Sequence, residues 1–306
     1  RPLRLRTRKP FTGDVTLDCW FTIWSFSHPS ELLRMREKIP YCFRFLRDNP
    51  NLWNLSRWHH YGTDLPEIPS EPTLPGFPLN EFQYAQLRHG LGCQSCKAHD
   101  TRKTYWAFLR RWCKSCFESK IIKEREALSL LQAAKISESQ PAMGGDLASI
   151  QTILQCVPSG MLDSWGNFVG VGPSQAQSLK TVYLGSDVER LITEYDEQAE
   201  ANKDTWESKV GDWARKKQEM VNQRREFARA MEQWENRSRT EKCGDHQSKK
   251  EARKKYFAEK AKQLDPPMNE EVLKRCPSYA RSVKIPKDPN PLAWTPLKPK
   301  LERERA

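Results

Sequence analysis

Two cysteine pairs in the first half of the chain have the residue types and the spacing needed to bind a metal ion. The stretch CQSCKAHDTRKTYWAFLRRWCKSC contains Cys93, Cys96, Cys113 and Cys116 in a C-x2-C-x16-C-x2-C pattern, which is typical of four-thiolate zinc sites. Two intervening residues let one tight turn direct both sulfurs at the same ion, and a hairpin of this length can return the second turn to the first. The pattern predicts one structural Zn²⁺ with no open coordination position for catalysis.

The residues between the two pairs leave other interpretations open. A redox dithiol is one alternative, although no strand followed by a Cys-x-x-Cys helix is recognisable here. Basic residues in the stretch would offset the charge of a zinc-thiolate centre: Lys97, Lys103, Arg110, Arg111 and Lys114. Four aromatic residues lie among the arginines, and they suit either stacking on single-stranded nucleic acid or a small core around the metal: Tyr105, Trp106, Phe108 and Trp112.

The composition bounds the possible classes of protein. The chain has 306 residues, of which 37% are apolar and 29% are charged, and its formal net charge is +12. So polar a chain is expected to have small cores and long solvated helices, and the positive charge permits a nucleic acid or an acidic partner. No acid–base pair, nucleophile triad or phosphate loop is recognisable, so we expect no enzyme. No run of 18 apolar residues occurs, so we expect no membrane span.

The cysteines also indicate a compartment. Five of the nine are scattered outside the cluster, which favours a reducing environment, cytoplasmic or nuclear. The first ten residues, RPLRLRTRKP, precede no apolar segment, so the pattern predicts no secretory signal there. The missing initiator Met leaves room for further residues upstream.

The organisation expected along the chain is mainly α-helical. Pro40 and His28-Pro29-Ser30 divide the first apolar segment into short helices, while the cysteine stretch should carry a short β hairpin between helices. The expected segments are a basic tail (1–13), a small helical module (14–58), a Pro-rich linker (59–79), a four-cysteine zinc module with flanking helices (80–135), an irregular segment (136–186), a long charged helical segment (187–265) and a Pro-rich basic tail (266–306).

The long helical segment has a seven-residue apolar repeat. Only Gly211 interrupts helix formers between Asp187 and Lys242, and Cys243-Gly244-Asp245 is expected to end the helix. A strict seven-residue repeat implies a seam against another helix, either within the chain or in a second copy. The first half of the segment is acidic and the second half is basic. The repeat consists of Ile192, Ala199, Trp206, Trp213, Met220, Phe227 and Trp234.

The segment DVTLDCWFTIWSFSHPSELLRMREKIPYCFRFLRDNPNLW resembles an F-box. It contains an apolar helix, a Pro followed by an acidic residue and Leu-Leu, a Phe-Arg helix and Pro-x-Leu-Trp. The residues in the family's positions are Val15, Asp18, Cys19, Ile23, Pro29, Glu31, Leu32, Leu33, Phe43, Arg44, Pro50, Leu52 and Trp53. Later segments resemble one group of fungal F-box proteins, namely WAFLRRWCKSC and VYLGSDVERLITEY.

The resemblance implies the role of an adaptor. F-boxes dock on the Skp-family subunit of cullin-RING ubiquitin ligases, and the rest of the chain would present a protein substrate. A 45-residue helical unit with more apolar residues than it can bury also suits docking. The residues expected at this contact are Val15, Cys19, Ile23, Pro29, Leu32, Leu33, Leu52 and Trp53. The alternatives are a zinc-containing, basic nucleic-acid-binding protein and a coiled-coil scaffold without a ligase role.

Overall fold

The structure, a computed structural model, describes residues 16–69, 79–134, 136, 150–174 and 176–305. The chain is mainly helical, as predicted, with two small antiparallel sheets. It divides into two compact units, one ending at Glu232 and the other starting at Gln233. The expected basic tail and residues 70–78 of the expected linker lie outside the described residues.

Four short helices form the N-terminal module: α1 (Leu17–Ser25), α2 (Pro29–Lys38), α3 (Pro40–Asp48) and α4 (Asn51–Tyr61). The side chain of Thr16 caps α1 by accepting from the N–H of Cys19, and the His28 ring caps α2 by accepting from the N–H of Ser30. Prolines start α2 and α3 at positions where no N–H is needed. The buried core of the module consists of Trp24, Leu32, Leu33, Cys42, Leu46, Leu52 and Trp53, with Ala85 from the following helix.

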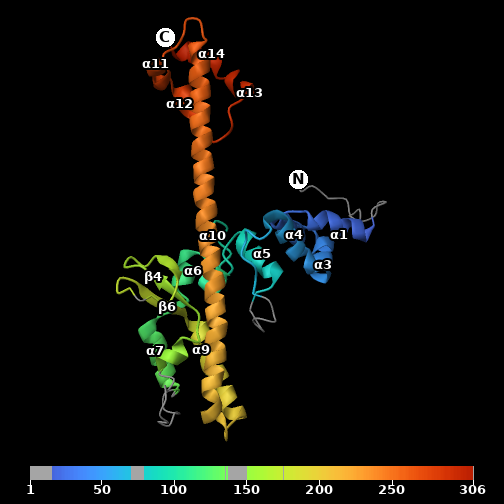
Figure 1. Cartoon of the computed structure of the whole chain (residues 1–306), viewed down its shortest axis with the longest axis vertical. Coiled ribbons are helices and arrows are strands. Elements are labelled where there is room, and N and C mark those ends of the chain that lie inside the picture. The colour runs from blue at the N-terminus through green and yellow to red at the C-terminus, as the bar shows by residue number, and fades with distance from the viewer. Residues whose placement is uncertain (1–15, 70–78, 135, 137–149, 175, 306) are drawn as a thin grey trace. The chain divides into compact units, whose positions relative to one another are not determined.

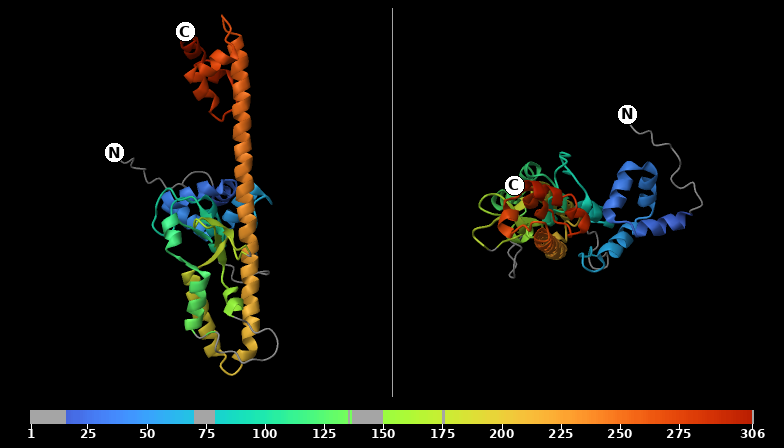
Figure 2. Two further views of the ribbon diagram at one scale, coloured as in Figure 1. Left: turned by 90° about the vertical axis from the view of Figure 1, so that its left-hand side faces the viewer. Right: turned by 90° about the horizontal axis from the view of Figure 1, so that it is seen from above.

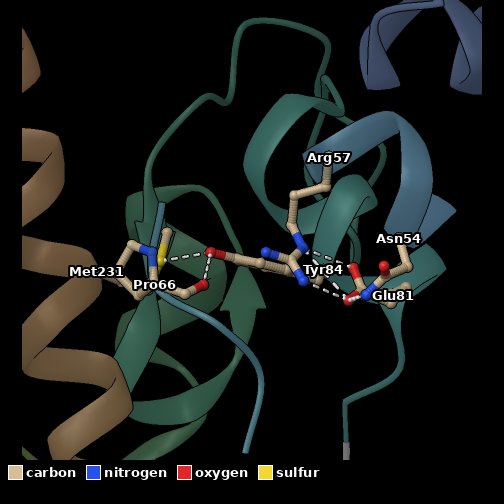
Figure 3. Close-up of polar contacts among 6 residues, drawn as sticks. All are labelled: Asn54, Arg57, Pro66, Glu81, Tyr84 and Met231. Carbon is tan, nitrogen blue, oxygen red and sulfur yellow. Dashed lines mark hydrogen bonds and ion pairs between the residues drawn. The ribbon is translucent and has the colours of Figure 1, made fainter. Parts of the chain in front are cut away.

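That following helix, α5 (Glu81–His89), is attached to α4 by a largely buried ion pair (Figure 3). The Arg57 side chain is 7% exposed, and its Nη2 lies 2.9 Å from Oε1 of Glu81. The Nε of Arg57 also donates to Oε2 of Glu81, at 3.0 Å, and Asn54 Nδ2 donates to Oε1 at 2.8 Å. Glu81 therefore gathers three donors from α4.

The opposite side of α5 contacts the long helix α10 (Trp206–Lys262). The Tyr84 hydroxyl donates to the carbonyl of Pro66 at 2.7 Å and lies 2.9 Å from Sδ of Met231, as Figure 3 shows. The Tyr84 ring also meets the ring of Phe227 with centroids 5.6 Å apart. Helix α5 thus links the N-terminal helices to the rest of the first unit.

The four-cysteine module contains the short hairpin that the sequence predicts. Strands β1 (Thr104–Tyr105) and β2 (Arg110–Arg111) pair antiparallel around the 3-10 helix η1 (Trp106–Phe108), and Leu109 takes a left-handed conformation in the turn. Helix α6 (Lys114–Glu118), strand β3 (Ile121–Lys123) and helix α7 (Glu124–Ala133) follow.

The region expected to be irregular contains three strands, which is a correction to that expectation. They are β4 (Ser159–Leu162), β5 (Phe168–Val171) and β6 (Lys180–Leu184), preceded by the short helix α8 (Ile150–Leu154). With β3 they form a four-stranded antiparallel sheet of order β3-β6-β4-β5 (Figure 1). Residues 137–149 and 175 of this region lie outside the described residues.

Residue 160, within strand β4, is a glycine on which two aromatic rings pack. A Cβ added to Gly160 in β4 would meet the Phe168 ring at 2.6 Å and the Phe108 ring at 3.0 Å. Glycine is thus required by a close approach of two aromatic rings to the strand, which is one of its recognised uses within sheets.

The long charged segment, expected to be one continuous helix from Asp187, forms two helices instead. Helix α9 (Gly185–Ala201) ends before a short turn, and α10 then runs alongside it, as Figure 1 and Figure 2 both show. The Tyr195 ring meets the rings of Trp206 and Trp213 with centroids 5.2 and 5.7 Å apart. Lys217 of α10 also pairs with Glu194 of α9, which joins the two helices by an ion pair.

The first half of the seven-residue repeat therefore packs within the chain. Trp206 belongs to a core cluster against which Ile192, Ala199 and Trp213 also pack. The end predicted at Cys243-Gly244-Asp245 is incorrect, because α10 continues to Lys262. One exposed glycine costs a helix only about 1 kcal/mol relative to alanine, and the Lys249–Asp245 pair spans the next turn.

The second unit has a core of its own, although a Pro-rich tail was expected for residues 266–306. Beyond α10 lie α11 (Glu270–Arg275), α12 (Pro277–Val283), α13 (Pro291–Trp294) and α14 (Lys298–Glu304). Prolines occupy the first or second position of three of these helices, where they favour helix formation instead of ending it. The buried residues are Phe257, Ala261, Leu264, Met268, Leu273, Cys276, Tyr279, Leu297 and Leu301.

Among the described residues, no helix has both the length and the apolar character that crossing a bilayer would require.

Candidate functional site

The four predicted ligand cysteines converge on one point. Their sulfur atoms all lie within 4.8 Å of one another, and Cys96 Sγ and Cys113 Sγ are 3.6 Å apart. In the part of the chain that the structure describes, this is the one group of three or more His, Cys, Asp or Glu ligand atoms close enough to share an ion. The predicted ligand set is thus brought together, and four thiols can hold one metal ion.

The first two ligands come from a tight turn that precedes β1. The N–H of Lys97 donates to the carbonyl of Cys93 at 3.0 Å, and the N–H of Cys93 donates to the carbonyl of Ala98 at 2.8 Å. Lys97 has a φ of 64°, a left-handed conformation that closes the turn. This backbone places the sulfurs of Cys93 and Cys96 on the same side.

The other two ligands belong to the start of α6. Cys113 is the residue before the first turn of α6 and Cys116 lies within that turn, so their spacing of three places both side chains on one face. The N–H of Cys113 points at Cys93 Sγ, 3.3 Å away, and the N–H of Ser95 points at the same sulfur from 3.4 Å. Backbone donors from both turns therefore favour a thiolate at Cys93.

The pKa values of the thiols diverge strongly. Burial opposes ionisation of Cys93, but backbone N–H groups, first that of Cys113, lower its pKa to about 6. The Ser115 hydroxyl lowers the pKa of Cys113, whereas the hydrogen bond to Cys113 raises the pKa of Cys116 to about 11. Four thiolates cannot coexist this closely without a cation, and a divalent ion would let all of them ionise.

A buried arginine, Arg111, fixes the four-cysteine module to the end of α5. Its side chain was expected only to offset thiolate charge, but the residue is 3% exposed, and its Nε donates to the carbonyl of Gly92 at 2.9 Å. Its guanidinium also donates to the carbonyls of Gln86 and Leu91. A Cβ at Gly90 would lie 2.6 Å from Nη2 of Arg111. The sequence signal was an Arg two residues before the second Cys pair together with a Gly directly after a helix.

The aromatic residues between the cysteine pairs form a core and not an exposed platform. Tyr105 is 3% exposed and stacks on Phe117 of α6 with ring centroids 4.0 Å apart. The three others are also buried, at 0%, 1% and 8% exposure: Trp106, Phe108 and Trp112. Of the two interpretations left open by the sequence, a small core beside the four cysteines is confirmed, and these rings are not accessible for stacking on bases.

The residues expected to contact an adaptor are divided by the fold. Val15 lies outside the described residues, and only Cys19 and Ile23 are exposed. The other five are buried in the module itself because its four short helices pack their apolar faces on one another: Pro29, Leu32, Leu33, Leu52 and Trp53. Their expected place on a docking surface is therefore corrected to a place in the core.

A different apolar surface is exposed on the same module. Thirteen large apolar side chains are exposed among the described residues, and seven of them lie between residues 17 and 58. Of these, only Ile23 was among the residues expected at the contact. They are Leu17, Ile23, Phe26, Ile39, Tyr41, Phe43 and Trp58.

Comparison with known proteins gives no relative. No family model, curated protein or solved structure matches the chain. Function is therefore inferred from the residues and surfaces of this chain.

Proposed function

We propose that the chain is a non-catalytic adaptor whose helices α1–α4 dock on a Skp-family subunit of a cullin-RING ubiquitin ligase. The remaining modules would present a protein substrate. The order of motifs in residues 14–58 resembles an F-box, and the exposed apolar surface of these helices supports docking on a protein.

The observation that carries this proposal is that α1 is apolar on two faces. Trp20, Phe21 and Trp24 face the core of the module. On the other face Ile23 is 49% exposed and Phe26 is 60% exposed, and with Cys19 they follow the i, i+4, i+7 spacing of one helix face. An apolar helix face ordinarily packs on another element, so the second face is expected to have a protein partner.

Neighbouring aromatic residues extend this face. The Phe26 ring lies 4.1 Å from the ring of His59, which in turn contacts the 55% exposed Trp58 of α4. Exposed tryptophan and phenylalanine side chains of this kind are enriched at the centres of protein interfaces. The contact surface that we propose is therefore Cys19, Ile23, Phe26 and Trp58.

We also propose that Cys93, Cys96, Cys113 and Cys116 bind one structural Zn²⁺. Four thiolates match the preference of zinc for sulfur in closed tetrahedral sites, and using all four leaves no position for substrate. In this role the ion would fix the two turns that carry the ligands, and with them the β1–β2 hairpin that supports the β4–β5 hairpin.

Neither of the other two functions has an observation in its favour that is as specific. The nucleic-acid alternative depended on aromatic residues that are buried, and the scaffold alternative depended on an apolar repeat of which Trp206 and Trp213 pack against α9. Binding of nucleic acid or self-association by the chain would favour one of these two alternatives.

Co-purification with a Skp-family adaptor tests the docking proposal. We expect the full chain to form a complex and Ile23→Glu to weaken it at least tenfold, because a charge would be buried in the contact. Leu292→Glu, at an 83% exposed position in the second unit, is the matched control and should bind normally. No complex with the wild-type chain, or equal affinity for Ile23→Glu, would contradict the proposal.

A further inference from the structure

The hairpin formed by β4 and β5, residues 159–171, presents an exposed tryptophan from an ordered tip. Trp165 is 83% exposed, more than any other tryptophan among the described residues. A Trp side chain this open to water keeps a large apolar area hydrated, which is unfavourable relative to burying it. A partner that covered Trp165 would therefore gain from removing this area from water.

Asp163 holds the tip in one conformation. One carboxylate oxygen accepts from the N–H of Trp165 at 2.9 Å and from the N–H of Asn167 at 2.7 Å, while the other accepts from Asn167 Nδ2 at 3.1 Å. The N–H of Gly166 donates to the carbonyl of Asp163, and the φ of Gly166 is +81°, which suits glycine. The backbone beside Trp165 is thus ordered by its own hydrogen bonds.

The strands of the hairpin are fixed to the four-cysteine module beside the tip and to α10 at the base. The Phe168 ring meets the rings of Tyr105 and Phe117 with centroids 5.0 and 5.6 Å apart. The N–H of Val171 donates to Oε2 of Glu232 in α10 at 3.3 Å. Both the tip and the base are therefore ordered, so little conformational entropy would be lost if Trp165 inserted into a partner.

Lysines lie around the hairpin together with two carboxylates that are already engaged, since Glu118 pairs with Lys114 and Glu232 accepts from the N–H of Val171. Lys180 of β6 is paired with Leu162 of the neighbouring strand β4, close to the tip. Lys103 Nζ donates to the carbonyl of Phe168 at 3.4 Å. The N–H of Asn167 lowers the pKa of the Asp163 carboxyl most, and the positive charge of Lys114 lowers it further. Asp163 is the one acidic residue between positions 159 and 171, and both of its oxygens already accept hydrogen bonds.

We infer that this Trp165 hairpin is a docking element for an acidic segment of another protein. Trp165 would supply the apolar anchor, and the lysines would contact acidic residues on either side of the apolar residue that it meets. Tryptophan is among the residues that contribute most at protein contacts, and complementary charge sets the orientation of the partner. The inference does not depend on the adaptor proposal, because the hairpin is distinct from helices α1–α4.

Selection from a displayed library of random peptides provides the probe. The library is selected on the immobilised full chain after depletion on the Trp165→Ala variant, and the affinities of enriched peptides are measured in solution. We expect peptides with an apolar residue between acidic ones, binding Trp165→Ala at least tenfold more weakly than the wild type. Leu292→Ala, which removes an equally exposed side chain, should leave affinity unchanged, and Trp165→Ala should leave the melting temperature unchanged.

Two further variants test whether Asp163 positions the tryptophan. Asp163→Ala removes the acceptor of three hydrogen bonds and should weaken peptide binding severalfold while Trp165 remains in the chain. Asp163→Asn keeps an acceptor oxygen and removes a negative charge, so it should bind acidic peptides at least as well as the wild type. Equal affinity of Asp163→Ala and wild type would overturn the positioning role.

The main inference has two contradicting outcomes. Enriched peptides that bind Trp165→Ala as well as the wild type would show that the hairpin is not the contact. Failure to enrich peptides, together with salt-dependent binding of single-stranded oligothymidine that Trp165→Ala abolishes, would assign the hairpin to nucleic acid instead.

Discussion

The sulfur atoms of Cys96 and Cys113 lie 3.6 Å apart, although one belongs to the turn before β1 and the other to the start of α6. Two sulfurs bound to one tetrahedral zinc at about 2.3 Å each would be about 3.8 Å apart, whereas a disulfide would require about 2 Å. The chain therefore brings the two halves of the cluster to a separation that suits a shared metal ion.

Removal of one ligand should unfold the module around the site. For Cys113→Ser we expect a fall of more than about 4 kcal/mol in the free energy of unfolding of this module, because loss of a structural metal is among the largest single-residue effects. Trp106 and Trp112 would become exposed, so tryptophan emission should shift to the red. Cys243→Ser, at an exposed cysteine of α10, is the control and should leave the spectrum unchanged.

Acid should release the metal. The pKa of Cys93 is lowered from 9.0 to about 6 in the folded chain, so its thiolate adds stability in full above pH 9, and this contribution is lost as pH falls through about 6. Bound zinc competes with protons for the same thiolates. A chromogenic chelator should therefore extract zinc much faster at pH 5 than at pH 8, and extraction that does not vary with pH would argue against thiolate ligation.

Core and surface residues of the N-terminal module should respond differently to substitution. Leu32 is completely buried, so Leu32→Ala should cost about 2–5 kcal/mol in the free energy of unfolding. Ile23→Ala should cost less than about 1 kcal/mol because half of that side chain is already exposed. Chemical denaturation followed by circular dichroism gives both values. An equally large loss of unfolding free energy in both variants would mean that Ile23 is buried and would contradict an exposed face of α1.

The ion pair between Arg57 and Glu81 should be sensitive to loss of one partner. Glu81→Ala leaves the largely buried guanidinium of Arg57 without its carboxylate, and breaking a buried pair in this way costs about 3–5 kcal/mol. The double variant Arg57→Met with Glu81→Leu should recover most of that loss, since apolar groups of similar volume need no counter-charge. Thermal unfolding measures both, and additive losses in the double variant would contradict the expected coupling.

The metal ligands were predictable because their geometry is local. Each Cys-x-x-Cys pair needs only one turn, so its spacing in the sequence is enough to predict it without knowledge of the rest of the fold. The anchoring of that site was not predictable in the same way, since Arg111 is held by carbonyls of residues about twenty positions earlier.

Two errors in the helical regions have a common physical origin. Gly244 was expected to end α10 but costs too little to do so within a helix of 57 residues. Residues 266–306 were expected to form a Pro-rich tail, yet Pro277 and Pro291 each start a helix. In both cases the effect of a residue depended on its position relative to the helix end, which the sequence pattern did not specify.

The strands β4–β6 were missed because their stabilising contacts are distant in sequence. The segment was expected to be irregular, and the approach of Phe108, which is distant in sequence, explains the glycine at position 160 of β4. The residues expected at the adaptor contact were misplaced for a similar reason. The sequence alone does not tell whether Leu32 and Leu33 face a partner or the core of their own module, where the structure buries them.

Metal analysis of the full chain, purified without added zinc, tests most directly whether the four cysteines bind one zinc ion. We expect about one zinc per chain and reaction of about two thiols in the folded protein, Cys19 and Cys243, which are the exposed cysteines outside the cluster. All nine thiols should react after unfolding with a chelator. Less than about half an equivalent of zinc, with the four cluster thiols reactive in the folded chain, would contradict the proposed site.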